Sequence, residues 1–193
     1  MTGTADYEAV VYDLDGTLVH LDVDWAAVER EVAAVLADAG LNADGLDTWA
    51  MFDVAAAHGL ADEVESVIAA HERAGADAAD RLPLADRLPR DVPVGVCSLN
   101  CEAACRTALD VHDLADHVHP DAVVGRDTVG ARKPDPAGLA AAVRALGASP
   151  ETALFVGDSA SDETTARRAG VDFAAVEPPW DEVPEGSFRD ATA

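Results

Sequence analysis

Ala9-Val10-Val11-Tyr12-Asp13-Leu14-Asp15-Gly16-Thr17-Leu18 is the stretch that decides the fold of this chain. Four apolar residues followed at once by Asp13 and Asp15 predict a short buried strand with two carboxylates at its C-terminal end. Because Gly16 tolerates backbone conformations that other residues avoid, the chain can turn there and point both acids toward one place. Open α/β sheets bind ligands at that end of their strands. We therefore expect a doubly wound parallel sheet with a site at the tip of its first strand.

Three later segments also carry polar residues next to a predicted element. Two of them follow an apolar strand, and the third precedes a helix. The segments are Val92 to Asn100, Arg132-Lys133-Pro134-Asp135-Pro136 and Ala153 to Asp162. In the second of them Asp135 is placed to cap a helix whose first position is Pro136. Parallel strands end at the same edge of a sheet, so these polar residues are expected beside the first two acids.

In chain order, these motifs resemble those of the haloacid dehalogenase superfamily of phosphohydrolases, in its phosphoglycolate-phosphatase-like form. They are Asp13-Leu14-Asp15-Gly16-Thr17-Leu18, the strand-end Ser98, Lys133 before a proline, and Gly157-Asp158-Ser159-Ala160-Ser161-Asp162. The resemblance covers residues 8–176. Leu99 is a departure, because relatives often carry Asn directly after the Ser or Thr of the second motif, and it leaves the role of Asn100 open.

The resemblance implies an Mg²⁺-dependent phosphomonoester hydrolase that acts on a small phosphorylated metabolite through an aspartyl-phosphate intermediate. Asp13 is expected to attack phosphorus, and Asp15 to protonate the leaving alcohol and then activate water. Mg²⁺ is expected at the Asp13 carboxylate, the Asp15 backbone carbonyl and Asp158. A cation is needed on charge grounds, because an anionic nucleophile approaches an anionic phosphate.

The phosphate-binding residues implied by the same resemblance are Ser98, the backbone of Leu99, and Lys133, with Asp162 orienting Lys133 or a metal-bound water. Lys133 is the only lysine among thirteen basic residues, the other twelve being arginines. A compact ammonium fits between a phosphoryl oxygen and a carboxylate in a way that a planar guanidinium does not. The retained lysine therefore supports a role in the site.

Other chemistries remain open to different degrees. A sugar phosphomutase of the same family shares all the motifs, and a non-catalytic Mg²⁺- or phosphate-binding module would keep the fold. A dehalogenase needs neither Asp15 nor Asp158, so the presence of both argues against that activity. A phosphonate hydrolase of the family uses a lysine from its cap, and residues 20–85 contain none.

The 193 residues carry a formal net charge of -24, with acidic side chains spread along the chain. Such a surface repels the phosphate backbone of nucleic acids. Its self-repulsion is screened in concentrated salt, which predicts a halophilic cytoplasm such as that of a halophilic archaeon. No run approaches the roughly twenty apolar residues of a membrane span, and no secretory leader is apparent. We expect a cytoplasmic monomer or homodimer with a small-molecule substrate and no nucleic-acid or membrane partner.

Residues 1–19 and 86–193 are expected to form the α/β core, and 20–85 a helical cap without strands that closes the site. Core strands are predicted at 8–13, 92–98, 121–125, 152–157 and 171–176, and core helices at 100–110, 135–147 and 160–169. Cap helices are predicted from Trp25 to near Gly40, around Trp49 before Gly59, and over 62–79. Residues 177–193 are expected to lie extended over the core or to fray.

A few remaining residues have less specific signals. Asp24 suits the N-cap of the helix that opens at Trp25. Cys101 and Cys105 lie one helical turn apart and are interpreted as buried apolar residues rather than metal ligands. His112, His117 and His119 lack zinc-site spacing and are expected in a solvated connection. His20 either faces the cleft or has a structural role.

Overall fold

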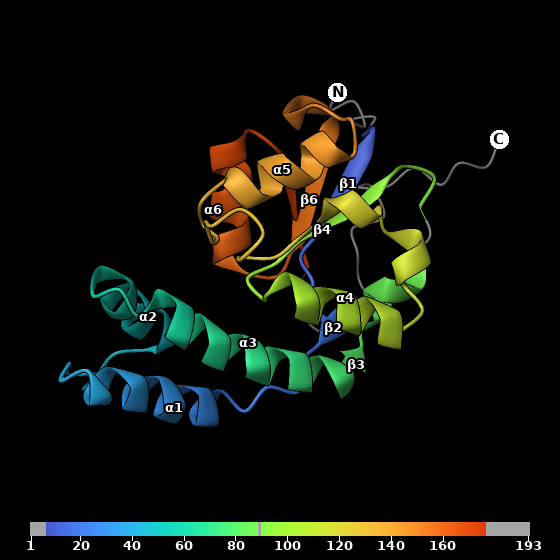
Figure 1. The fold of residues 1–193 in the computed structure, drawn as a ribbon. Helices are drawn as coiled ribbons and strands as arrows, with labels where there is room; N and C mark the ends of the chain where they lie inside the picture. The colour runs from blue at the N-terminus through green and yellow to red at the C-terminus, as the bar shows by residue number, and fades with distance from the viewer. Residues whose placement is uncertain (1–6, 89, 177–193) are drawn as a thin grey trace.

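The computed structural model describes residues 7–88 and 90–176, so the predicted position of the 177–193 tail lies outside the described residues. Its central sheet has five parallel strands in the order β5-β4-β1-β6-β7 (Figure 1). The strands are β1 (Ala9–Tyr12), β4 (Val94–Cys97), β5 (Val123–Val124), β6 (Ala153–Gly157) and β7 (Asp172–Ala175). The predicted doubly wound parallel sheet is confirmed, and each strand begins and ends within two residues of its predicted bounds.

Helices account for most of the remaining described chain. They are α1 (Trp25–Asp38), α2 (Thr48–Ala57), α3 (Ala61–Asp77), α4 (Glu102–Val111), α5 (Ala137–Ala145) and α6 (Ala160–Ala169), with short 3-10 turns at Pro83–Arg87, Ala115–His117, Pro120–Ala122 and Pro150–Thr152. The α5 helix begins at Ala137, two residues after the start of the predicted range 135–147 and one after the predicted first position Pro136. Asp135 still acts at this end, because its Oδ1 accepts a hydrogen bond from the Ala137 N–H at 2.9 Å.

Side-chain alternation along the strands divides the core into two layers. Val10 and Tyr12 pack in one cluster with α4, whereas Val11 packs in a second cluster with α5 and α6. The sheet is therefore covered on both faces, which explains why its inner strands β1, β4 and β6 are buried at every position. No helix in the described part of the chain is long and apolar enough to cross a bilayer.

The three helices α1, α2 and α3 form a separate layer below the sheet in Figure 1, where α3 lies alongside α4. They bury a cluster of their own that includes Val28, Val32 and Ile68. The α1 helix opens as predicted, because the Asp24 carboxylate accepts the Ala27 N–H at 2.9 Å. The apolar spacing seen in the sequence thus produces a small three-helix unit.

The prediction that residues 20–85 contain no strand is wrong at both ends of the segment. Val19–His20 (β2) and Asp80–Arg81 (β3) pair as an antiparallel ribbon. A two-residue strand is too short to show periodicity, and its partner lies about sixty residues away, so local sequence carries no signal for it. The ribbon brings the two ends of the helical insertion together beneath the first strand's tip.

Candidate active site

Three neighbouring strands deliver polar side chains to one edge of the sheet. Asp13 follows β1, Ser98 follows β4 and Asp158 follows β6, and β1 lies between the other two. The backbone N–H of Asp13 donates to Val156 of β6 at 2.8 Å, which fixes the turn at the end of β1. The predicted residues therefore meet at the carboxyl ends of the strands.

A buried lysine stands between two of the acids. The Lys133 Nζ lies 2.9 Å from Asp13 Oδ1 and 2.5 Å from Asp162 Oδ1. Burial alone would lower the pKa of Lys133, but the two carboxylates outweigh it and raise that pKa. Lys133 is therefore held as an ammonium ion.

The position of Asp162 is set by the start of α6. Its Oδ2 accepts hydrogen bonds from the backbone N–H of Ser159 at 3.0 Å and from the Ser159 hydroxyl at 2.5 Å, forming a capping box. A Cβ on Gly157 would lie 2.7 Å from the Asp162 carboxyl carbon, so only glycine permits this approach. Asp162 thereby presents its other oxygen to Lys133.

Asp13 is the most perturbed acid of the site. Burial raises its pKa to about 7, an effect that the charge of Lys133 opposes and that of Asp162 reinforces. Its Oδ1 also accepts the Leu14 N–H at 2.7 Å. A buried carboxylate of this kind needs positive charge nearby to remain ionised.

Within the described residues, Asp13, Asp158 and Asp162 form a cluster able to hold a metal ion. One carboxylate oxygen from each lies within 4.8 Å of the others. Asp158 is oriented by the Thr17 hydroxyl, which donates to its Oδ1 at 3.0 Å. Gly16, at φ +85°, allows the first motif to pass this carboxylate, because a Cβ there would lie 2.5 Å from Asp158 Oδ2.

The Asp15 carboxylate is not part of that cluster, but it lines the same cavity as Asp13 and Asp158. Its Oδ1 accepts the Leu21 N–H at 2.9 Å and lies 3.5 Å from His20 Nδ1. Burial raises the pKa of Asp15, and the Leu21 N–H and His20 oppose the shift. A carboxyl with a raised pKa is suited to donating a proton. His20 thus contacts an acid of the site through a largely exposed ring.

Asn100, whose role the intervening Leu99 left open, is a direct partner of Ser98. The Ser98 hydroxyl donates to Asn100 Oδ1 at 2.9 Å, and the Asn100 backbone N–H donates to Ser98 Oγ at 3.2 Å. Both side chains are buried. Leu99 therefore does not disrupt the turn, and Asn100 holds the serine hydroxyl in place at the end of β4.

A cavity of about 180 Å³ opens above these groups. Its walls are Asp13, Asp15, Trp25, Trp49, Glu72, Ser98, Leu99, Asn100, Asp158 and Ser159. Trp25, the first residue of α1, is 37% exposed and lines this cavity. Spacing placed Trp25 in line with Val28 and Val32, but at the first turn of α1 that stripe reaches beyond the helical cluster to the cavity.

The curated relatives agree with the motifs. A protein from Rhodospirillum rubrum named phosphoglycolate phosphatase is 36% identical over 85% of this chain and 77% of its own length. A second protein of that name, from Cereibacter sphaeroides, is 34% identical over 86% of this chain and 83% of its own length. Residues 86–176 match the family model for haloacid dehalogenase-like hydrolases. The chain belongs to the haloacid dehalogenase-like hydrolase family. It is a phosphatase of that family.

Solved structures show the same fold. A crystal structure from Lactobacillus plantarum, provisionally named a phosphoglycolate phosphatase, has a TM-score of 0.61 and 25% identity, covering 93% of this chain and 90% of that chain. A family hydrolase from Deinococcus radiodurans, crystallised with phosphate and sodium, has a TM-score of 0.57 and 22% identity, covering 88% and 80%. The fold of this haloacid dehalogenase-like phosphatase is thus shared with solved structures from other bacteria.

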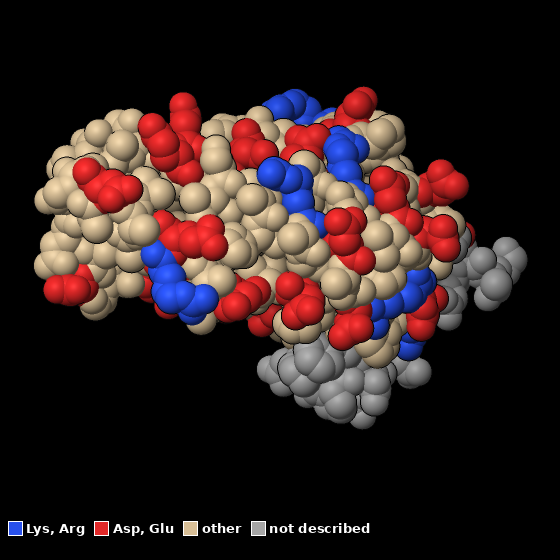
Figure 2. Space-filling view, turned by 60° about the horizontal axis from the view of Figure 1, so that its bottom comes forward, with Lys and Arg blue, Asp and Glu red and all other residues tan. Residues whose placement is uncertain are grey.

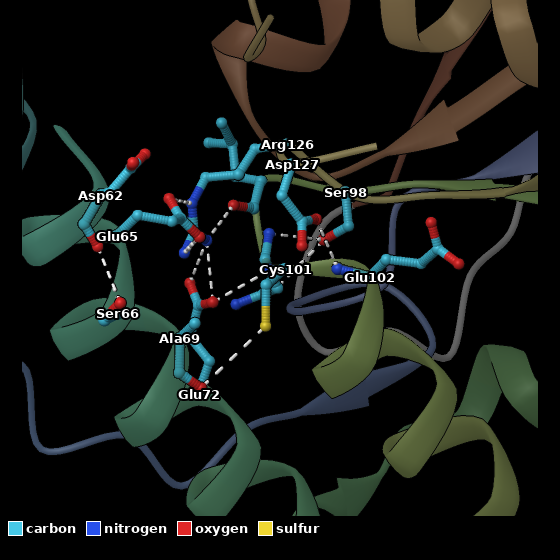
Figure 3. A network of polar contacts seen from close by, with 12 residues as sticks. Asp62, Glu65, Ser66, Ala69, Glu72, Ser98, Cys101, Glu102, Arg126 and Asp127 are labelled. Atoms are coloured by element: carbon cyan, nitrogen blue, oxygen red, sulfur yellow. Dashed lines mark hydrogen bonds and ion pairs between the residues drawn. The ribbon is translucent and has the colours of Figure 1, made fainter. Parts of the chain in front are cut away.

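Beside the active site of this phosphatase lies a polar network that the motifs do not predict (Figure 3). Arg126 donates to both oxygens of Glu72 at 2.6 and 2.8 Å and to the Leu99 carbonyl at 2.7 Å. Glu72 also accepts the Cys101 N–H at 2.9 Å. Glu65 pairs with the other side of the same guanidinium. The network fastens α3 to the loop that follows β4.

A sequence signal for Glu72 did exist. It falls four residues after Ile68 and eight after Val64, on the apolar face of α3, and it is fully buried. An acid on such a face requires a cationic partner. Arg126, which lies in the loop after β5, carries no comparable local signal.

Proposed function

We propose that this phosphatase hydrolyses a small phosphomonoester in an Mg²⁺-dependent reaction through an aspartyl-phosphate on Asp13. The observation that carries the proposal is the placement of Asp13 beside the Lys133 ammonium, within a cluster of carboxylate oxygens that includes Asp158. An activated nucleophile, a fixed positive charge and a cation site at one strand edge are the parts that phosphoryl transfer requires.

The residues present fit Mg²⁺. Every candidate ligand is an oxygen, the type that hard divalent cations prefer. The raised pKa of Asp13 points the same way, because the charges of the described residues do not fully compensate its burial. We expect the Asp13 carboxylate, the Asp15 backbone carbonyl and Asp158 to hold the ion. When bound, Mg²⁺ supplies positive charge between the nucleophile and the phosphate.

Side chains of this chain supply the two chemical steps. In the first, an Asp13 oxygen bonds to phosphorus while the bond from phosphorus to the leaving oxygen breaks, and Asp15 gives that oxygen its proton. In the second, Asp15 takes a proton from water, whose oxygen attacks phosphorus and releases inorganic phosphate and Asp13. The Leu99 N–H, Lys133 and the Ser98 hydroxyl, once it turns from Asn100 to the substrate, hold the phosphoryl oxygens.

Two further residues act by positioning others. Asp162 accepts from Lys133 and keeps the ammonium directed at the phosphoryl site. Asn100 keeps the Ser98 hydroxyl at the end of β4.

Residues 20–85 are proposed to act as a cap on a core made of 1–19 and 86–193. Support comes from Trp25, Trp49 and Glu72, which belong to α1, α2 and α3 and line the same cavity as the motif residues. A wall of this kind excludes water from the phosphoryl site and selects the leaving group. The names of the curated relatives make phosphoglycolate the first ester to assay.

Replacing Asp13 by Asn tests the assignment. Asp13→Asn is expected to lower the Mg²⁺-dependent release of phosphate from p-nitrophenyl phosphate by about a thousandfold or more, because the nucleophile is lost. Asp38→Asn, an exposed acid at the end of α1, is the matched control and should retain wild-type turnover. Substantial hydrolysis by the Asp13 variant would refute the nucleophile.

The same assays separate the remaining alternatives. Isomerised sugar phosphate formed without free phosphate would identify a phosphomutase. Binding of Mg²⁺ or phosphate with no ester hydrolysed at all would identify a non-catalytic module.

A further inference from the structure

The cavity wall opposite the motif residues is acidic and aromatic. Beyond Asp13, Asp15 and Asp158, its charged member is Glu72, which stands with Trp25 and Trp49. Among the described residues that line the cavity there is no lysine, arginine or histidine. A leaving group bearing a carboxylate would therefore meet negative charge there and no cation to receive it.

Two buried cations lie near this wall, Lys133 and Arg126, and both are already paired with carboxylates of the protein. Lys133 is paired with Asp13 and Asp162 at the phosphoryl end of the site. Arg126 lies with its guanidinium carbon 5.5 Å from the centre of the Trp49 ring. All three of its guanidinium nitrogens donate, to Glu65 and Glu72 (Figure 3) and to the Leu99 carbonyl.

Glu72 carries its negative charge into the wall. Each bond drawn to its carboxylate comes from a donor, namely the Arg126 guanidinium and the Cys101 N–H (Figure 3). An acceptor-only carboxylate is the ionised form. Glu65, Glu72 and Arg126 together hold two negative charges and one positive charge, so the network remains net negative by one.

A third cation lies just outside the cavity. Arg132 packs its guanidinium 5.5 Å from the Trp49 ring centre, and its Nη2 lies 2.7 Å from Asp53. It is absent from the cavity wall. Arg132 is therefore the alternative partner for a substrate carboxylate if its ion pair with Asp53 opens.

We propose that the substrate of this phosphatase has an uncharged leaving group and that Glu72 determines this specificity by repelling carboxylates. The inference rests on the proposed function. Like charges a few Å apart repel more strongly in a partly dry cavity than in water. Trp25 and Trp49 add aromatic surface to this wall, which suits a neutral hydroxylated or aromatic alcohol. Glu72 is thus a specificity residue of the cap, and phosphoglycolate is a poor substrate.

A matched pair of esters tests the preference. Phosphoglycolate and 2-hydroxyethyl phosphate share the phosphate and the two-carbon chain, and differ in a carboxylate against a hydroxymethyl group. We expect kcat/KM to be at least about tenfold higher for 2-hydroxyethyl phosphate with the wild-type enzyme in Mg²⁺ at fixed ionic strength, a difference of about 1.4 kcal/mol. An equal or higher kcat/KM for phosphoglycolate would overturn the inference.

Two isosteric variants on the same helix assign the effect. Glu72→Gln removes the charge from the cavity wall while keeping a carbonyl oxygen for the Cys101 N–H. It should reduce the preference for the neutral ester at least about fivefold, whatever its effect on overall turnover. Glu65→Gln removes the same unit of charge from the network but not from the cavity wall, so it should reduce the preference less than Glu72→Gln does. Equal ratios in the wild type and Glu72→Gln would show that Glu72 is merely structural.

The remaining outcomes separate this inference from the proposed function. If neither ester nor p-nitrophenyl phosphate is hydrolysed, the proposed function fails and the inference fails with it. A preference for phosphoglycolate that Arg132→Gln abolishes would leave the proposed function standing, overturn the inference, and assign carboxylate binding to Arg132.

Discussion

Asp13 is the residue at which the electrostatics of the site are most finely balanced. Its carboxyl is buried beside one cation and near the carboxylates of Asp158 and Asp162. Burial raises its pKa from 3.8 to about 7. Without a metal, the ionised form therefore destabilises the folded state, and this has a measurable pH dependence.

In metal-free protein, the free energy of unfolding of the wild type relative to Asp13→Asn is expected to fall as the pH rises from 4 to 8. The unfolded chain loses this proton near pH 4, whereas the folded chain keeps it to about pH 7, so the stabilisation by the proton is complete below pH 4 and lost above pH 7. Urea unfolding of both proteins in EDTA measures the difference. A difference that is constant across this range would contradict the raised pKa.

Replacing Lys133 by Arg tests whether the phosphoryl site needs the compact shape of the ammonium group or only its positive charge. Lys133→Arg keeps the positive charge for Asp13 and Asp162, but places a planar fork where a compact ammonium fits. We expect kcat to fall about a hundredfold while the melting temperature changes by only a few degrees. Arg144→Lys, an exposed reciprocal exchange on α5, should leave both unchanged. Wild-type kcat in Lys133→Arg would show that any cation suffices.

At the scale of elements, α3 is held at two places, one on the core and one within the insertion. Through Glu72 it reaches the loop after β4, and through Gly75 it touches the segment that leads into α1. The backbone N–H of Asp22 donates to the Gly75 carbonyl at 3.2 Å. The position of α3 therefore follows from close packing as well as from helical periodicity.

Gly75→Ala should destabilise the protein by about 1–3 kcal/mol, because a Cβ there would lie 2.8 Å from the Asp22 carbonyl oxygen and from Val23 Cγ2. Helix propensity alone predicts the opposite, a gain of up to about 1 kcal/mol. Thermal or urea unfolding decides between them. Ala74→Gly, at the exposed neighbouring position, is the control and should show only the propensity loss. A more stable Gly75→Ala would contradict the packing.

At the scale of the whole molecule, negative charge dominates the surface. Figure 2 shows acidic side chains scattered over one face, with basic ones interspersed singly or in small groups. With a net charge of -24 on 193 residues, self-repulsion opposes folding wherever salt is dilute.

We expect the melting temperature to rise substantially between about 0.1 M and molar KCl, because the Debye length falls from about 10 Å to about 3 Å over this range. Refolding yield should rise in parallel. Choline chloride at matched concentration separates screening from specific K⁺ binding. Equal stability at low and molar salt would contradict the predicted halophilic adaptation.

Sequence alone determined the parts of this protein whose physical cause is local. The apolar run before Asp13 and the one before Asp158 had to be buried strands, and their tips had to meet because parallel strands end together. The spacing of Val28, Val32 and Leu36 likewise fixed α1. These patterns located the sheet, the insertion and the acidic cluster.

Only the tertiary structure decided which residues each face of a helix or strand contacts. Helical spacing showed that Glu72 lies on the apolar face of α3, but only the packing of α3 on the core brought Arg126 to it. The same packing turned Trp25 and Trp49 to the cavity and closed the β2–β3 ribbon. Periodicity fixes a direction around a helix or strand, whereas the partner in that direction comes from residues distant in the chain. The motif residues were therefore predictable, and the cavity wall contributed by α1, α2 and α3 was not.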